Sequence, residues 1–283
     1  MSENPTRDRL RLSRNVKLLG WASLLNDVSS EAIYPLLPEF LLGLGGSRTQ
    51  LGFLEGPADT TASLLKLWSG HLSDRLGRRK SFIVVDYALA GLSRPCLAAV
   101  NQLWQVFGIS LLDRVGNGLR TSPWDAMIAE STPHEQRGRA FGFHRAMDHL
   151  GAAVGPALAT LFLWFVPDGL RTLMLLTLIP GLLVLALQIF GLREASPSPG
   201  GAPQSGVPKG PFLLYLVSLL VFTFANSRDA FLLIRARELG VATEWLPLLW
   251  TMLHVLKSGG NRLGGRLADH RPPRALIVTG WLL

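Results

Sequence analysis

Apolar residues of this chain gather in blocks of about twenty, the length that a helix needs to cross the hydrocarbon core of a bilayer. None of the blocks shows the apolar–polar alternation that is typical of membrane strands. The pattern therefore predicts an all-α, polytopic membrane bundle with helices at Leu18–Leu44, Leu51–Leu72, Phe82–Val100, Leu103–Ile128, Ala140–Val166, Leu170–Leu192, Phe212–Ile234 and Trp245–Leu267. A ninth block begins at Ala275 and reaches Leu283. Pro35 and Pro38 predict a kink in the first block, because proline lacks the amide donor that a helix needs.

The segment REASPSPGGAPQSGVPKG, Arg193–Gly210, interrupts this pattern. Its Pro, Gly and Ser content predicts a flexible linker. We therefore expect three parts: a six-helix bundle at 1–192, a cytoplasmic linker at 193–210, and the start of a second bundle at 211–283. The second bundle would hold helices seven and eight and part of helix nine.

Charge adds an orientation to this picture. The chain has a formal net charge of +8 and a mean hydropathy of +0.28. Most Lys and Arg residues of the loops fall in the N-terminal tail and in the loops on its side of the membrane. The positive-inside rule then predicts a multi-pass protein of the cell membrane, inner or plasma, with a cytoplasmic N-terminus. Because topology accounts for the basic excess, no nucleic-acid partner is predicted.

One charged corner occurs twice. GHLSDRLGRRK spans Gly70–Lys80, and GRLADHRPPR spans Gly265–Arg274. Each copy follows the second helix of its half, so the fold is predicted to be a duplicated six-helix bundle whose second repeat is incomplete. A carboxylate here can accept hydrogen bonds from the N-terminal amides of a neighbouring helix, or pair with Arg78. The pattern predicts a conformational latch formed by Gly70, Asp74, Arg75, Gly77, Arg78 and Asp269. The alternative is a topology anchor that faces lipid phosphates.

These motifs resemble those of a known family. The first corner resembles the cytoplasmic-loop signature of the major facilitator superfamily, G-x-L-x-D-R-x-G-R-R/K. LLDRVGNGLR resembles the R-x-x-Q-G motif through Arg114, and GAAVGPALA resembles the antiporter-type G-x-x-x-G-P motif through Gly151, Gly155 and Pro156. The resemblance covers about residue 16 to the end and is nearest to bacterial drug/proton antiporters. It implies alternating access, with Arg114 in coupling and the glycine–proline motif as a hinge. Family members usually have twelve helices, so the chain is expected to stop in the ninth, as a fragment or a truncated product.

Many ionisable residues fall inside the predicted helices, where each costs about 2.5–3.5 kcal/mol on insertion scales unless it meets a partner or water. Asp27 and Glu31 share one helix face, and two neighbouring acids can share a proton. The alternative is a permanent pair of Glu31 with Arg114 or Arg120. The predicted proton and substrate path comprises Asp27, Glu31, Glu55, Asp59, Lys66, Arg114, Arg120, Asp125, His144, Asp148 and Lys257. Asp86, Arg94, Asp113, Arg228 and Asp229 are further charges in the same blocks.

His144, Asp148 and His149 could ligate a divalent metal, but a polar face lining the path is the favoured interpretation. No cofactor and no metal site are predicted. The sequence contains no G-x-S-x-G elbow, H-E-x-x-H helix or Cys/His cluster, so an enzyme is not expected.

The sequence thus predicts a secondary active transporter that exports a small molecule against a proton gradient by alternating access. A metabolite facilitator or symporter of the same fold, or a truncated non-transporting remnant, are the alternatives. The expected partners are a small-molecule substrate, protons and the lipid bilayer, and the oligomeric state is left open.

Overall fold

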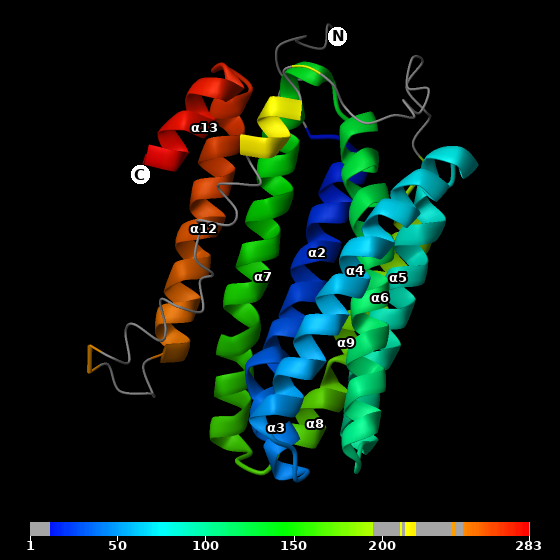
Figure 1. Cartoon of the computed structure of the whole chain (residues 1–283), viewed down its shortest axis with the longest axis vertical. Helices are drawn as coiled ribbons and strands as arrows, with labels where there is room; N and C mark the ends of the chain where they lie inside the picture. The colour runs from blue at the N-terminus through cyan, green and yellow to red at the C-terminus, as the bar shows by residue number, and fades with distance from the viewer. Residues whose placement is uncertain (1–11, 195–209, 211–212, 219–238, 241–245, 283) are drawn as a thin grey trace, which may run out of the picture.

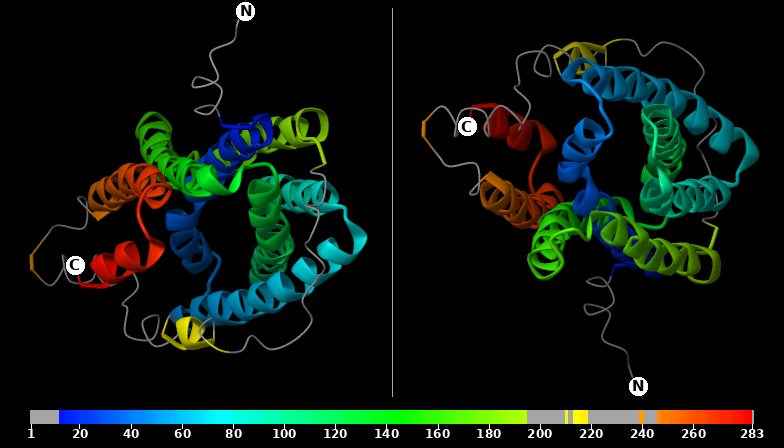
Figure 2. Two further views of the ribbon diagram at one scale, coloured as in Figure 1. Left: turned by 90° about the horizontal axis from the view of Figure 1, so that it is seen from above. Right: turned by 90° about the horizontal axis from the view of Figure 1, so that it is seen from below.

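A computed structural model describes residues 12–194, 210, 213–218, 239–240 and 246–282. Within these ranges the chain forms helices and turns and no strand, so the predicted all-α bundle is confirmed. Long, roughly parallel helices stand side by side, with α12 and α13 beside α7 (Figure 1). Seen along the bundle, the helices surround a common axis (Figure 2).

The first apolar block is broken in two. Helix α2 spans Arg14–Ile33 and α3 spans Leu37–Gly43, with the 3-10 turn η1 (Tyr34–Leu36) between them. Pro35 and Pro38 explain the break because neither can donate a helical hydrogen bond. The kink that these prolines predict is confirmed.

The next helices match the predicted blocks and extend them by a few residues. Helix α4 (Arg48–Leu76) begins at a capping box formed by Ser47 and Gln50 and ends at Gly77, whose φ of 63° is accessible mainly to glycine. Helix α5 (Arg79–Cys96) continues into η2 (Leu97–Ala99), and α6 spans Leu103–Glu130. The remaining elements are η3 (His134–Gln136), α7 (Arg137–Phe165), α8 (Leu170–Leu176), α9 (Leu178–Ala186), the π turn η4 (Leu187–Gly191), α12 (Leu246–Ala268) and α13 (Pro273–Leu282).

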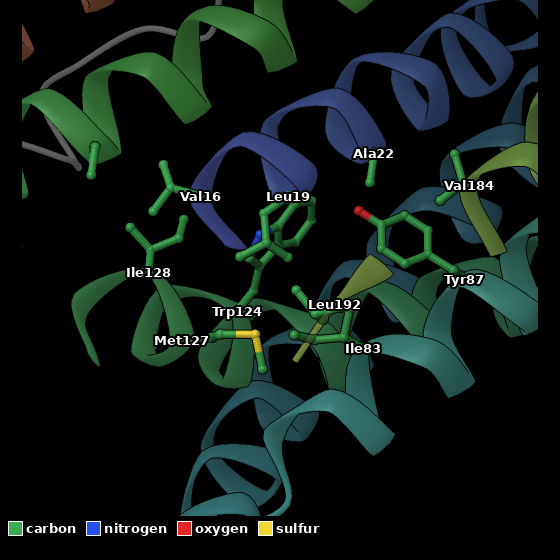
Figure 3. Packing of buried hydrophobic residues seen from close by; sticks show 11 residues of the cluster. Val16, Leu19, Ala22, Ile83, Tyr87, Trp124, Met127, Ile128, Val184 and Leu192 are labelled. Atoms are coloured by element: carbon green, nitrogen blue, oxygen red, sulfur yellow. The ribbon is translucent and has the colours of Figure 1, made fainter. Parts of the chain in front are cut away.

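Helix α7 lies between α2 and α12. It packs along α2 on one side and along α12 on the other, while α6 packs against α4 and α5. A buried apolar cluster lies where α2, α5, α6 and α9 converge; its members include Leu19, Ile83, Tyr87, Trp124 and Met127 (Figure 3). Most of the predicted seventh block and of the linker lies outside the described residues.

Three helical segments of the described chain are long and apolar enough to cross a membrane: Arg79–Ala99, His134–Phe165 and Leu170–Gly191. Helices α4 and α6 are as long but carry more charged residues, as the sequence indicated. Large apolar side chains on the outer surface, such as Trp164 and Phe190, are 80% and 83% exposed, which suits contact with lipid.

Candidate functional site

Two ion pairs cross between α5 and α6. Asp86 Oδ2 lies 3.0 Å from Arg120 Nε, and Arg94 Nε lies 2.9 Å from Asp113 Oδ1. The acid comes first on both helices, Asp86 before Arg94 and Asp113 before Arg120. Because a three-residue connection makes these helices antiparallel, each acid then faces a base. The pairs therefore fix the register of the two helices.

Arg120 is buried between two aromatic rings. Its guanidinium carbon lies 4.8 Å from the centre of the Tyr87 ring and 4.5 Å from that of Trp124. The Trp124 ring in turn meets His144 of α7 edge-on, with 4.4 Å between centroids. The buried arginine is thus held by one carboxylate and two aromatic faces.

Asn26 connects the second ion pair to the first helix. Arg94 Nη1 donates to Asn26 Oδ1 at 2.9 Å and to the Asn26 carbonyl at 3.1 Å. Asn26 Nδ2 donates to Asp27 Oδ1 at 3.0 Å. A continuous polar chain therefore runs from Asp113 of α6 through Arg94 of α5 to Asp27 of α2, and Asn26 within it is only 5% exposed.

Asp27 and Glu31 both face this network. Asp27 interacts electrostatically with Arg120, Arg94 and Asp113, and Glu31 interacts with Asp27, Arg94 and Arg114. Arg114 lies beside Tyr34, with 5.9 Å from its guanidinium carbon to the ring centre. The structure thus brings Asp27, Glu31, Arg114 and Arg120 of the predicted path into one neighbourhood.

The glycine–proline motif of α7 lies against the same stretch of α2. A β-carbon added at Gly151 would lie 2.5 Å from the Leu24 carbonyl oxygen and 2.9 Å from Asp27 Cβ. One added at Gly155 would lie 2.8 Å from the Val28 carbonyl oxygen. The two backbones meet here, and Pro156 sits within the continuous helix α7. A movement of α7 relative to α2 would therefore change the surroundings of the Asp27 side chain directly.

A second charged group lies nearby on α7. Arg145 Nη1 is 3.2 Å from Asp148 Oδ2, and Arg145 Nη2 is 3.9 Å from Asp125 Oδ1. His144 Nδ1 lies 3.9 Å from Asp148 Oδ2. Asp125 also interacts electrostatically with Lys66 of α4, which links this group to the predicted path.

Within the described ranges, the structure does not place the other predicted path residues within this network. Lys257 lies on α12, one turn after His254. Glu55 and Asp59 belong to α4, but their side chains lie outside the described part of the structure, as do Arg228 and Asp229. Among the residues that are described, no group of three or more His, Cys, Asp or Glu side chains is placed to hold a metal. His149 turns instead toward His254 of α12, with 3.2 Å between their Nδ1 atoms.

The first charged corner is closed by Arg79. Arg79 Nη1 lies 2.8 Å from Asp74 Oδ1, and Arg79 Nη2 lies 2.6 Å from Glu130 Oε1. Arg79 Nε also donates a hydrogen bond to Glu130 Oε2. Arg78, the partner that the sequence suggested, is the exposed residue before α5, and Arg75 lies in the last turn of α4. Glu194 accepts a hydrogen bond from the Arg79 backbone N–H at 2.7 Å.

The second corner contacts the beginning of α7. Asp269 Oδ2 accepts a hydrogen bond from the backbone N–H of Arg139 at 2.8 Å. Just beyond, α7 and α12 meet without intervening side chains, since a β-carbon on Gly142 would lie 2.6 Å from Gly265 Cα. Helix α12 is therefore held against α7 at the end of the bundle that contains both corners.

The arrangement matches a known family. The model of the Major Facilitator Superfamily matches residues 19–283. This chain belongs to the major facilitator superfamily. The resemblance found in its motifs is thereby confirmed, and the chain is placed among membrane transporters.

Two relatives and one solved structure illustrate the likeness. An uncharacterised MFS-type transporter of Methanocaldococcus jannaschii is 35% identical over 300 residues, covering 100% of this chain and 73% of that protein. The multi-drug resistance efflux pump PmrA of Streptococcus pneumoniae is 25% identical over 287 residues, covering 91% of this chain and 68% of the pump. The crystal structure of the human organic anion transporter MFSD10 matches with a TM-score of 0.67 at 16% identity, over 93% of this chain and 73% of that one. That last likeness concerns the fold alone.

Several residues of the network escaped the sequence-based list of path residues: Asp86, Arg94, Asp113, Asn26, Tyr87 and Trp124. The sequence identifies the first three only as charges inside predicted helices. Their spacing was an available indication, because Asp86 and Arg94 are eight residues apart and Asp113 and Arg120 seven, each about two helical turns.

Proposed function

We propose that this protein exports a small molecule across the cell membrane in exchange for protons, with its N-terminus in the cytoplasm. The observation that carries the proposal is the position of Asp27. It lies at the end of the polar chain Asp113–Arg94–Asn26 and beside the backbone contact between α2 and Gly151 of α7. A carboxyl that gains or loses a proton there changes the charge balance of the network and is in contact with the helix that joins the two halves.

The proposed cycle uses this position directly. When Asp27 is ionised, Arg94 and Arg120 face a negative charge on α2, and that attraction favours a close approach of the helices. Protonation removes the attraction and leaves the cations to other anions, including those of a substrate. Glu31, on the same helix face, shares this task. The likeness to an efflux pump supports export as the direction of transport.

The two charged corners would act at the cytoplasmic end. Asp74 with Arg79, and Asp269 with the first turn of α7, are contacts that hold this end together. An inward-open state requires α12 to leave α7, which breaks the second contact. This is the role of the latch that the repeated motif predicts.

The test uses the protein in proteoliposomes with an imposed pH gradient and a panel of fluorescent cationic and anionic dyes. We expect wild type to move at least one dye against its concentration gradient when the gradient drives protons the other way. Asp27→Asn should abolish this uphill movement and retain dye exchange down its gradient. Asp168→Asn, at an exposed loop residue, is the matched control.

Two results would contradict the proposal. Uphill transport by Asp27→Asn at the wild-type rate would remove Asp27 from coupling. Dye movement that is indifferent to the pH gradient would indicate a facilitator instead.

A further inference from the structure

His149 and His254 face each other across the contact between the two halves. Their Nδ1 atoms are 3.2 Å apart and their ring centroids 5.3 Å apart. His149 lies on α7, which belongs to the six-helix half, and His254 lies on α12, which belongs to the second half. The pair lies well inside both helices, away from the charged corners at their ends. The proton path proposed above does not use it.

The geometry of the helix pair holds the two rings in place. Ser258, one turn after His254, donates from its hydroxyl to the carbonyl of Ala146, one turn before His149, at 2.6 Å. Trp250 lies one turn before His254, and the centroids of their rings are 4.9 Å apart. His254 is 8% exposed and His149 is half-buried, so the pair is fixed by its surroundings and still approachable from the His149 side.

This spacing suits a tetrahedral metal ion. Imidazole nitrogen is a preferred ligand of Zn²⁺, Cu²⁺ and Ni²⁺. Two nitrogens bound to one zinc at about 2.0–2.1 Å in a tetrahedron are about 3.3–3.4 Å apart. The observed separation of 3.2 Å is close to this value, so the helix pair holds the two Nδ1 atoms at about the spacing that one ion requires.

We propose that His149 and His254 form a two-histidine site for a divalent transition-metal ion, with Zn²⁺ as the expected occupant. The ion would link α7 to α12 and so stabilise the state in which the two halves are in contact at this level. Two protein ligands leave two positions for water, so binding is weaker than at a structural zinc site with four protein ligands. A transporter that must separate these helices would be slowed by the bound ion.

The first test measures metal binding alone and needs no transport assay. The tag-free protein is freed of metal with a chelator and titrated with ZnCl₂ or NiCl₂ by calorimetry. We expect saturable binding of one ion per chain in wild type. His149→Gln and His254→Gln should both lose it, because glutamine retains a hydrogen-bonding side chain but is a poor ligand for these metals. His270→Ala, at an exposed histidine near the end of α12, should bind as wild type does.

Folding is checked for each variant by its elution as a single species and by its thermal unfolding temperature without metal. A second reading uses fluorescence: Ni²⁺ should quench the emission of Trp250, and Trp250→Phe should remove that part of the change. Absence of saturable binding in wild type would show that the pair is a hydrogen bond only and would overturn the proposal. Binding that survives in either glutamine variant would overturn it as well. Failure of proton-coupled transport would leave this result unaffected.

Discussion

Asp269 Oδ2 accepts a hydrogen bond from the backbone N–H of Arg139 at a distance of 2.8 Å. Arg139 lies in the first turn of α7, where free amides and the positive end of the helix dipole favour an anion. Asp269 directly follows α12. The acid of the second corner therefore caps α7, whereas its counterpart Asp74 pairs with Arg79 within its own corner.

Removing the charge of Asp269 should weaken the contact between α7 and α12. Asp269→Asn retains an oxygen acceptor but loses the interaction with the helix dipole, worth about 0.3–1 kcal/mol. We expect α7 and α12 to separate more readily. In a Cys96→Ser background, a disulfide between Ala146→Cys and Ser258→Cys should therefore form more slowly.

Asp168→Asn, at an exposed loop residue outside both charged corners, is the matched control. A cross-linking rate in Asp269→Asn that equals the rate in the control would show that the Asp269 contact does not hold α12 in place.

The ion pair of Asp86 with Arg120 should be the more costly of the two to break. Their side chains are only 2% and 10% exposed, whereas Asp113 is 27% exposed. Asp86→Asn leaves the Arg120 guanidinium without its carboxylate and should cost about 3–5 kcal/mol in the free energy of unfolding. Asp113→Asn should cost less, as measured by denaturant unfolding in detergent.

The double variant Asp86→Asn with Arg120→Gln gives the decisive comparison. Its loss of stability should be clearly smaller than the sum of the two single losses, because the partners interact directly. Simple additivity would mean that the two residues are energetically independent.

Gly151 should not tolerate a methyl group. The added β-carbon of Gly151→Ala would lie 2.5 Å from the Leu24 carbonyl oxygen, so α7 must move away from α2. We expect a lower thermal unfolding temperature, together with slower transport.

Gly108→Ala is the matched control within α6, because nothing lies within 4 Å of its added β-carbon. There the methyl group restricts the unfolded chain and should stabilise the protein by about 0.4–1 kcal/mol. A Gly151→Ala variant as stable as wild type would refute the backbone contact.

Arg79, and not Arg78, should hold the first corner together. Arg79→Lys loses the paired contacts to Glu130, since an ammonium cannot bind both carboxylate oxygens as a planar guanidinium does. We expect a loss of about 1–3 kcal/mol in the free energy of unfolding, because Arg79 and Glu130 are only 14% and 13% exposed. The measurement is denaturant unfolding of Arg79→Lys beside Arg78→Lys. A larger loss from Arg78→Lys would reverse this assignment.

The helices and the family were predictable because each depends on local information. The length of each apolar block predicts a helix, and Pro35 and Pro38 predict the break after α2. The motif that begins at Gly70 indicates the family. The partners of the buried charges were not predictable in the same way. Hydropathy indicates that Asp86 must find a partner, but only the rotation of α5 against α6 decides that the partner is Arg120.

The same reasoning applies to the contacts of α7 with α2 and α12. The sequence places His144, Asp148 and His149 within two turns of one helix, which suggested a shared polar face. In the structure, α2 and α12 occupy different sides of α7, so Asp148 interacts electrostatically with Asp27 and His149 faces His254. Local spacing could not show which neighbour each side chain meets.

The π turn η4 has a consequence for comparing this chain with its relatives. A π turn holds one more residue than an α turn, so it is equivalent to a single-residue insertion in the helix. In this turn Gln188 is fully buried, and the Ile189 carbonyl accepts a hydrogen bond from Lys80 Nζ at 2.7 Å. The helix ends at Gly191, so deleting one residue in the turn would displace buried Leu192 and Arg193, whose backbone N–H donates to Asn15 Oδ1 at 3.3 Å. A relative that lacks the extra residue must be aligned with a gap within Leu187–Gly191, or Leu192 and Arg193 will be matched one position out of register.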